Sequence, residues 1–173
     1  MDGNFNPKIA DFGNAIENAI NLNYFFGAKP YIAPELLRFV PYDGFKVDIF
    51  SLRVTLMYLT FCFPGLFEAS KYCNFYRKIM LNKREDYINN LKTYVKEELS
   101  AEFQDLFLKM VAYKPQNRPS IHEVLEHKWL KSYFELNDEQ KKSLEGEIVA
   151  EFKDRFDKIQ KSITKEIEKS NMD

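Results

Sequence analysis

Short motifs of chemically capable residues lie in a fixed order along this chain of 173 residues. The first, Asp11-Phe12-Gly13, is a weak signal alone, because an aspartate shortly before a glycine is also typical of a turn. A carboxylate is, however, the ligand that a hard divalent cation prefers. Further motifs follow it along the chain, and their spacing makes a chance occurrence of the first motif less plausible. They are Ala33-Pro34-Glu35 after nineteen intervening residues, Asp48-Ile49-Phe50-Ser51-Leu52, Asn117-Arg118-Pro119-Ser120 and His127-Lys128-Trp129-Leu130.

In this order and spacing, the motifs resemble those of the protein kinase superfamily, which has an Asp-Phe-Gly, an activation segment and an Ala-Pro-Glu in succession. The run at 27–35, Gly-Ala-Lys-Pro-Tyr-Ile-Ala-Pro-Glu, resembles the serine/threonine branch. The last two motifs resemble calcium/calmodulin-dependent-type kinases. The resemblance covers about residues 5–133. It implies ATP-dependent phosphoryl transfer to Ser or Thr of proteins by a full-length parent.

The resemblance gives the first motif a role in binding Mg·ATP. Asp11 is expected to chelate the Mg²⁺ that bridges the β- and γ-phosphates in the full-length parent. Phe12 is expected to pack beneath the catalytic site, and Gly13 to permit a sharp turn. Mg²⁺ and ATP are therefore the cofactors expected of the parent.

The later motifs are expected to be structural. Glu35 and Arg118 are predicted to form a buried ion pair, because the planar fork of Arg binds a carboxylate in a bidentate way. Asp48 is predicted to begin an apolar helix, where a carboxylate gains from the positive helix end. The resemblance also implies that Asp48 accepts backbone N–H groups of the catalytic loop.

Several parts of the family pattern do not occur in these residues. The Gly-rich loop, the ATP-binding Lys and the catalytic loop with its Asp precede Asp-Phe-Gly in the family, and ten residues precede it here. No catalytic residue is therefore assigned. Phosphoryl transfer depends on positioning and electrostatics, so this chain alone is predicted to be inactive, with weak or no Mg·ATP binding.

Three smaller departures concern the segment between the first two motifs and the central helix. Ala28 replaces the family's Thr, and residues 14–32 contain no Ser or Thr. The usual regulatory switch, in which a phosphate on Ser or Thr binds an Arg cluster, is therefore not available in this segment. Phe50 stands where Trp is usual and Arg53 where Gly is usual. A bulky cation in a central helix predicts relaxed packing, or a helix face that is not buried.

The hydrophobic pattern predicts a mainly α fold: a partial kinase C-lobe with a short N-terminal β-hairpin remnant, including 8–10, and a long C-terminal helix. Residues 47–62 are apolar around nearly the whole helix circumference, which suits the centre of a domain. Helices are also expected at 70–81, after Ser100 and after Ser120, with a polar stretch at 82–90. Two domains follow, a partial kinase domain at 1–133 and a charged amphipathic helical tail at 134–173.

The composition excludes some classes of function. A net charge of −1 provides no field for nucleic acid or for an acidic membrane surface. The longest apolar stretch is interrupted by charges and Pro-Gly, so no membrane span is expected. Two cysteines make no disulfide framework, which favours reduced thiols and the cytoplasm or nucleus.

Three hypotheses remain open at this point. The chain is a fragment of a serine/threonine kinase, whose partners are a protein substrate and the missing N-terminal kinase portion. Alternatively, it is a pseudokinase-like binding module that presents the lower lobe to a partner protein. The third is an unrelated helical protein with chance motifs. The tail mixes acids with bases on its polar face, which argues against calmodulin binding.

Overall fold

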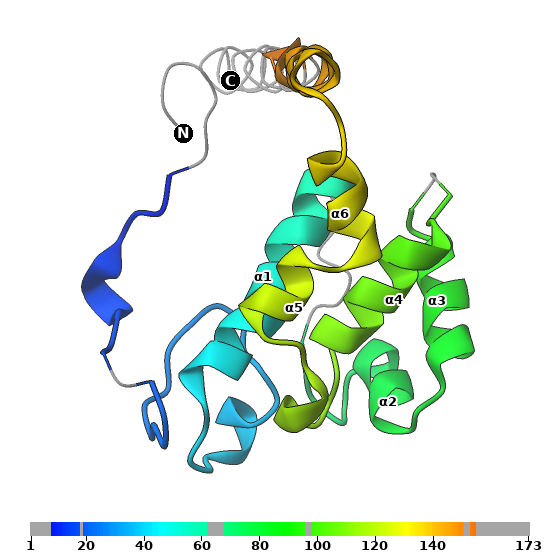
Figure 1. Ribbon diagram of the computed structural model, residues 1–173. Coiled ribbons are helices and arrows are strands. Elements are labelled where there is room, and N and C mark those ends of the chain that lie inside the picture. Colours follow the sequence, from blue (N-terminus) through cyan, green and yellow to red (C-terminus); the bar gives the residue numbers. More distant parts are fainter. Residues whose placement is uncertain (1–7, 18, 62–67, 96–97, 151–152, 155–173) are drawn as a thin grey trace, which may run out of the picture. The chain divides into compact units, whose positions relative to one another are not determined.

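The computed structural model describes residues 8–17, 19–61, 68–95, 98–150 and 153–154, which are mainly helical (Figure 1). The mainly α fold class is thereby confirmed. Contacts divide the chain into two units, residues 13–131 and residues 1–12 with 132–173, and each is described by itself. No helix within the described ranges is both long enough and apolar enough to cross a membrane.

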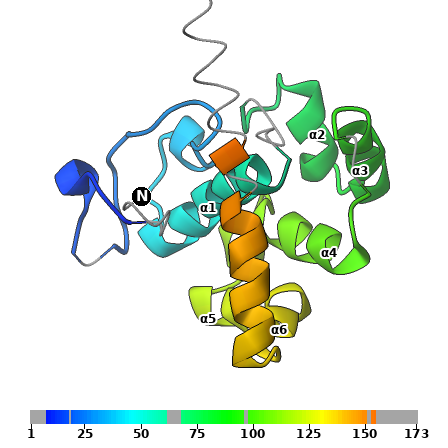
Figure 2. The same cartoon turned by 90° about the horizontal axis from the view of Figure 1, so that it is seen from above.

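The unit at 13–131 is built on helix α1, Gly44–Phe61, which packs against α4, Ala101–Met110. Helices α2, Asn74–Met80, and α3, Arg84–Lys92, lie side by side (Figure 2). The short helix α5, Ile121–Leu125, follows α4, and α6, Lys128–Phe134, continues past the end of this unit.

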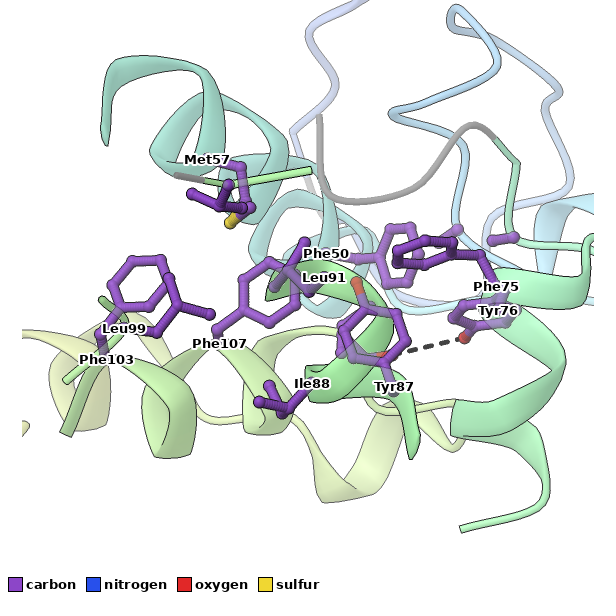
Figure 3. Packing of buried hydrophobic residues seen from close by; sticks show 14 of the residues in the cluster. Phe50, Met57, Phe75, Tyr76, Tyr87, Ile88, Leu91, Leu99, Phe103 and Phe107 are labelled. Atoms are coloured by element: carbon purple, nitrogen blue, oxygen red, sulfur yellow. Dashed lines mark hydrogen bonds between the residues drawn. The ribbon is translucent and has the colours of Figure 1, made fainter. Parts of the chain in front are cut away.

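The main core of this unit is aromatic and lies between α1, α2, α3 and α4. Tyr87 stacks on Phe107, and Phe107 stacks on Phe103, with ring centroids 5.9 and 6.0 Å apart. The Tyr76 hydroxyl donates to the carbonyl of Val111, so this buried polar group is satisfied (Figure 3). The fully or almost fully buried side chains of the cluster include Phe50, Met57, Tyr76, Tyr87, Leu91, Phe103, Phe107 and Val111.

Two helix starts have the side-chain caps that the sequence predicts. The Ser100 Oγ accepts the N–H of Phe103 at the start of α4. At α5, Ser120 Oγ accepts the N–H of Glu123 while the Glu123 carboxylate accepts the N–H of Ser120. Each cap satisfies backbone donors that have no partner within the helix.

The central helix differs in detail from its prediction. It begins at Gly44 instead of 47, and Asp43 Oδ1 accepts the N–H of Phe45 at 2.9 Å. Asp43 therefore fills the capping role predicted for Asp48, which lies one turn inside α1. One face of α1 is exposed rather than buried, and Phe45 retains 63% of its accessible surface. Cys62, the predicted last residue, lies outside the described residues.

Other elements also depart from the sequence expectations. The strand expected at 8–10 is irregular, and every residue from 8 to 17 is exposed, so no core supports strand pairing there. The helix expected at 70–81 begins only at Asn74. The polar stretch at 82–90 instead contains most of α3, which buries only Tyr87, Ile88 and Leu91. In the tail, residues 138–150 and 153–154 are helical, whereas 135–137 are not. Residues 151–152 and 155–173 of the predicted tail lie outside the described residues.

Candidate functional site

The first motif spans the point in the sequence where one unit ends and the other begins, and its three residues are exposed. Asp11 has φ 61°, a left-handed conformation that Asp tolerates better than most residues. Phe12–Asn14 forms one 3-10 turn. Phe12 is 69% exposed, so the packing expected beneath a catalytic site is not made among the described residues.

The described residues do not provide a complete magnesium site. Within the described ranges, no three His, Cys, Asp or Glu side chains gather closely enough to hold a metal ion. Asp11 supplies a single carboxylate, whereas Mg²⁺ requires octahedral oxygen coordination. The donor set of the described residues therefore does not fit the metal by itself, and no catalytic step is assigned to it.

The loop between the first two motifs is attached to the start of α1 by backbone hydrogen bonds. Leu22 and Tyr42 form an isolated antiparallel bridge, with N–H to carbonyl distances of 2.9 and 3.0 Å. The Gly44 N–H donates to the Ala19 carbonyl at 2.6 Å. This approach leaves no room for a side chain, since a Cβ on Gly44 would lie 2.8 Å from the Ala19 Cβ.

We expect Gly44→Ala to lower the free energy of unfolding of the unit at 13–131 by about 1–3 kcal/mol, because the loop at Ala19 must move away. Urea denaturation followed by fluorescence of Trp129, the chain's single Trp, measures this unit. Gly146→Ala is the matched control, because a Cβ there meets nothing within 4 Å. An unchanged urea midpoint for Gly44→Ala would contradict the prediction.

The second motif is anchored by the ion pair between Glu35 and Arg118. The two guanidinium NH groups of Arg118 donate to the two carboxylate oxygens at 2.6 and 2.7 Å. Both side chains are buried. Arg118 also donates to the carbonyls of Ala112 and Lys46, both at 2.9 Å. One side chain therefore joins the Ala-Pro-Glu motif, the start of α1 and the segment just after α4.

A second buried cation lies beside this pair. Arg53 has no accessible surface, and its guanidinium carbon lies 4.4 Å from the centre of the Phe50 ring. Its Nη2 donates to the carbonyl of Pro30 at 2.8 Å. Burial lowers the pKa of Arg53 to about 10. The unburied helix face predicted for Arg53 is therefore wrong, since a planar guanidinium can lie on a ring while it donates at its edge. The relaxed packing that was the other alternative stays a prediction.

Asp48 lies in a groove along the exposed face of α1. Its side chain is exposed, but partial desolvation still raises the pKa of its carboxyl group above the usual range. The groove has a volume of about 500 Å³. Its lining is mostly apolar and consists of Phe45, Lys46, Asp48, Ile49, Leu52, Pro119, Ser120 and Ile121.

Sequence reasoning missed three features of this site. One is the groove itself, which Ile121 lines with a half-exposed side chain. The role of Asp43 was also missed, although an Asp directly before Gly44 is a common N-cap signal. The contact between Arg53 and Pro30 has no signal in the sequence, because it depends on how the loop folds back on α1.

Several known proteins are similar to this chain. The family model of the protein kinase domain matches residues 1–130. Sperm motility kinase 3A of Mus musculus is 34% identical over 126 residues, covering 71% of this chain and 23% of that protein. The serine/threonine-protein kinase SIK3 homolog of Danio rerio is 32% identical over 133 residues, which is 76% of this chain and 10% of that protein.

A yeast relative extends the match. Serine/threonine-protein kinase GIN4 of Saccharomyces cerevisiae is 30% identical over 148 residues, which is 84% of this chain and 12% of that protein. The chain thus spans a quarter or less of the length of these relatives. The calcium/calmodulin-dependent type stays a prediction. The extent of the family match, together with these relatives, shows that the chain belongs to the eukaryotic protein kinase superfamily, on its serine/threonine branch.

Proposed function

We propose that this chain is the lower-lobe part of a serine/threonine kinase that transfers a phosphoryl group from ATP to protein hydroxyls. The observation that carries the proposal is the buried, bidentate Glu35–Arg118 pair. It holds Ala33-Pro34-Glu35 against α1 within the part of the chain that matches the kinase domain. Burying two charges costs desolvation free energy, so we interpret this pair as one that serves to hold the two segments in a defined geometry.

The role proposed for Asp11 belongs to a longer polypeptide. Asp11 would hold Mg²⁺ there together with oxygen ligands that these residues do not supply. The metal would offset the charge of the phosphates. Phe12 and Gly13 would set the position of Asp11, since Gly13 lacks a Cβ at the sharp turn. Without the missing ligands, we propose that the chain binds Mg·ATP weakly or not at all.

We propose the groove on α1 as the surface that receives the preceding part of the kinase domain. Phe45, Ile49 and Leu52 recur at helical spacing and line it together with Ile121. Such an exposed apolar strip is unusual for a protein that acts alone. The relatives are four to ten times longer than the matched part, and the preceding portion of the kinase domain is the occupant that we propose. Asp48, at the edge of the groove, would accept hydrogen bonds from that portion.

The chain alone is expected to transfer no phosphate. Generic Ser/Thr protein substrates and radiolabelled ATP would be mixed with the 173-residue chain, with Asp11→Ala as the control. The physical reason is that the groups that position the phosphates and activate the hydroxyl are missing. Incorporation of label that disappears in Asp11→Ala would overturn this expectation.

A chimera tests the proposed parent function. The part of sperm motility kinase 3A that precedes its match would be fused to this chain. The proposal expects label on Ser or Thr that is lost in Asp11→Ala. A chimera that folds and binds ATP but transfers no phosphoryl group would contradict the proposal. That outcome would favour the second candidate function, a binding module without catalysis. The exposed groove and the lack of Ser or Thr at 14–32 also favour this second candidate. Residence in the cytoplasm or nucleus stays a prediction, and so does binding of a protein substrate or partner protein.

A further inference from the structure

Two side chains of α1 hold one short stretch of the preceding loop. Ser51 Oγ donates to the carbonyl of Tyr31 at 2.9 Å, and Arg53 Nη2 donates to the carbonyl of Pro30 at 2.8 Å. The donors are two residues apart, and the acceptors are adjacent. The stretch Pro30–Tyr31 lies just before the Ala-Pro-Glu motif that the Glu35–Arg118 pair anchors.

The Phe50 ring links the two anchors. Its centroid lies 4.4 Å from the guanidinium carbon of Arg53 and 4.9 Å from that of Arg118. A guanidinium over a ring face is attracted by the electron density of the ring, more strongly where water is excluded. The ring thus contacts both the cation that binds the Pro30 carbonyl and the cation that binds Glu35.

A buried Arg needs an explanation because removing a cation from water is expensive. A pKa of about 10 still leaves Arg53 charged at neutral pH. Its bond to the Pro30 carbonyl is therefore assisted by charge, and such bonds are about twice as strong as neutral ones. This strong hydrogen bond is made to the backbone of the loop, at the carbonyl of Pro30.

We propose that Arg53 is a positioning residue that fixes the Pro30–Tyr31 backbone on α1, with Phe50 as the surface on which its guanidinium lies. This goes beyond the proposed function, because it concerns how the segment is held whether or not phosphate is transferred. Residues 14–32 contain no Ser or Thr, so a phosphate on either is not the means of ordering them. The cation of Arg53 is present at all times and holds the segment without modification.

The same geometry accounts for two departures from the family pattern as one exchange. Phe50 stands where Trp is usual, and Arg53 stands where Gly is usual. A Phe ring is smaller than an indole and leaves room on α1, and the Arg53 guanidinium occupies space against that ring. The two residues are therefore expected to act together rather than independently.

Hydrogen exchange of the full chain tests the proposal. The Tyr31 amide reports on the stretch, because it donates to the Ala28 carbonyl at 2.9 Å. In Arg53→Met, its exchange is expected to become at least about tenfold faster, with amides of α4 unchanged. Arg77→Met is the matched control, because Arg77 is exposed on α2 and should leave Tyr31 unaffected. A Tyr31 rate within about twofold of the parent chain contradicts the proposal.

The design separates positioning from simple stabilisation. Equal acceleration of the Tyr31 amide and the α4 amides would mean that Arg53 only supports the fold, which also contradicts the proposal. If Arg53→Met does not fold, Arg53→Lys replaces it. Lys keeps the charge but lacks the planar fork, so selective acceleration at Tyr31 is again expected and parental exchange there contradicts the proposal.

The platform role of Phe50 has its own test. In a Phe50→Leu background, Arg53→Met is expected to accelerate Tyr31 exchange by less than about threefold, because the guanidinium has already lost its ring. An undiminished tenfold effect would show that Arg53 acts without Phe50, and would remove that part of the proposal.

Discussion

Replacing Arg118 by Ala is expected to lower the free energy of unfolding of the unit at 13–131 by roughly 3–5 kcal/mol. The substitution leaves the Glu35 carboxylate buried without its cation, and the carbonyls of Ala112 and Lys46 each lose a donor. A stranded buried charge costs far more than the loss of an exposed pair. Urea denaturation monitored by Trp129 fluorescence measures the change.

Two further variants show whether burial causes this effect. Lys109→Ala removes an ion pair with Asp105 whose partners are about half-exposed, and should cost less than about 1 kcal/mol. The double variant Glu35→Leu/Arg118→Met removes both buried charges and is expected to be much more stable than Arg118→Ala. A loss below about 1 kcal/mol in Arg118→Ala would mean that the pair is solvated in solution.

Phe107→Ala is the other substitution with a large expected effect, a loss of about 3–5 kcal/mol in the same free energy. Phe107 is completely buried and lies between the rings of Tyr87 and Phe103. Its removal leaves a cavity in a core whose backbone on α3 and α4 can close only partly. The urea midpoint reported by Trp129, whose ring contacts Phe103, is expected to fall accordingly.

Phe45→Ala is the control for Phe107→Ala. It deletes the same side chain from the exposed face of α1 and should change the free energy of unfolding by no more than about 0.5 kcal/mol. Equal losses in the two variants would contradict the packing described for Phe107. They would also show that Phe45 is covered in the isolated chain.

The sequence predicts best the elements whose signals are local. Ser100 and Ser120 each cap a helix as expected, because a cap depends on residues within one turn. The apolar spacing of Phe103, Leu106, Phe107 and Met110 likewise identifies the buried face of α4. The Glu35–Arg118 pair was expected only because the motifs resemble a family, since no local rule joins residues so far apart.

The failures have physical causes of the same kind. Helix α3 was missed because three apolar residues make its buried face and the rest is polar. The position of Arg53 was misjudged because charge predicts exposure, whereas a ring and a carbonyl from another segment complete its environment. The exposed face of α1 was missed because an apolar pattern indicates which side chains are suited to burial. It does not indicate whether a neighbouring element covers them.

The Glu35–Arg118 bond also has a consequence for the order of folding. It joins residues 83 positions apart, and α1 to α4 all lie between them. Helices and neighbouring helix pairs form from local contacts, while a bond that closes so long a loop must wait for them. The pair should therefore be largely absent from the transition state. Its loss would then accelerate unfolding and leave the rate of folding almost unchanged, so the pair acts as a kinetic lock on the finished lobe.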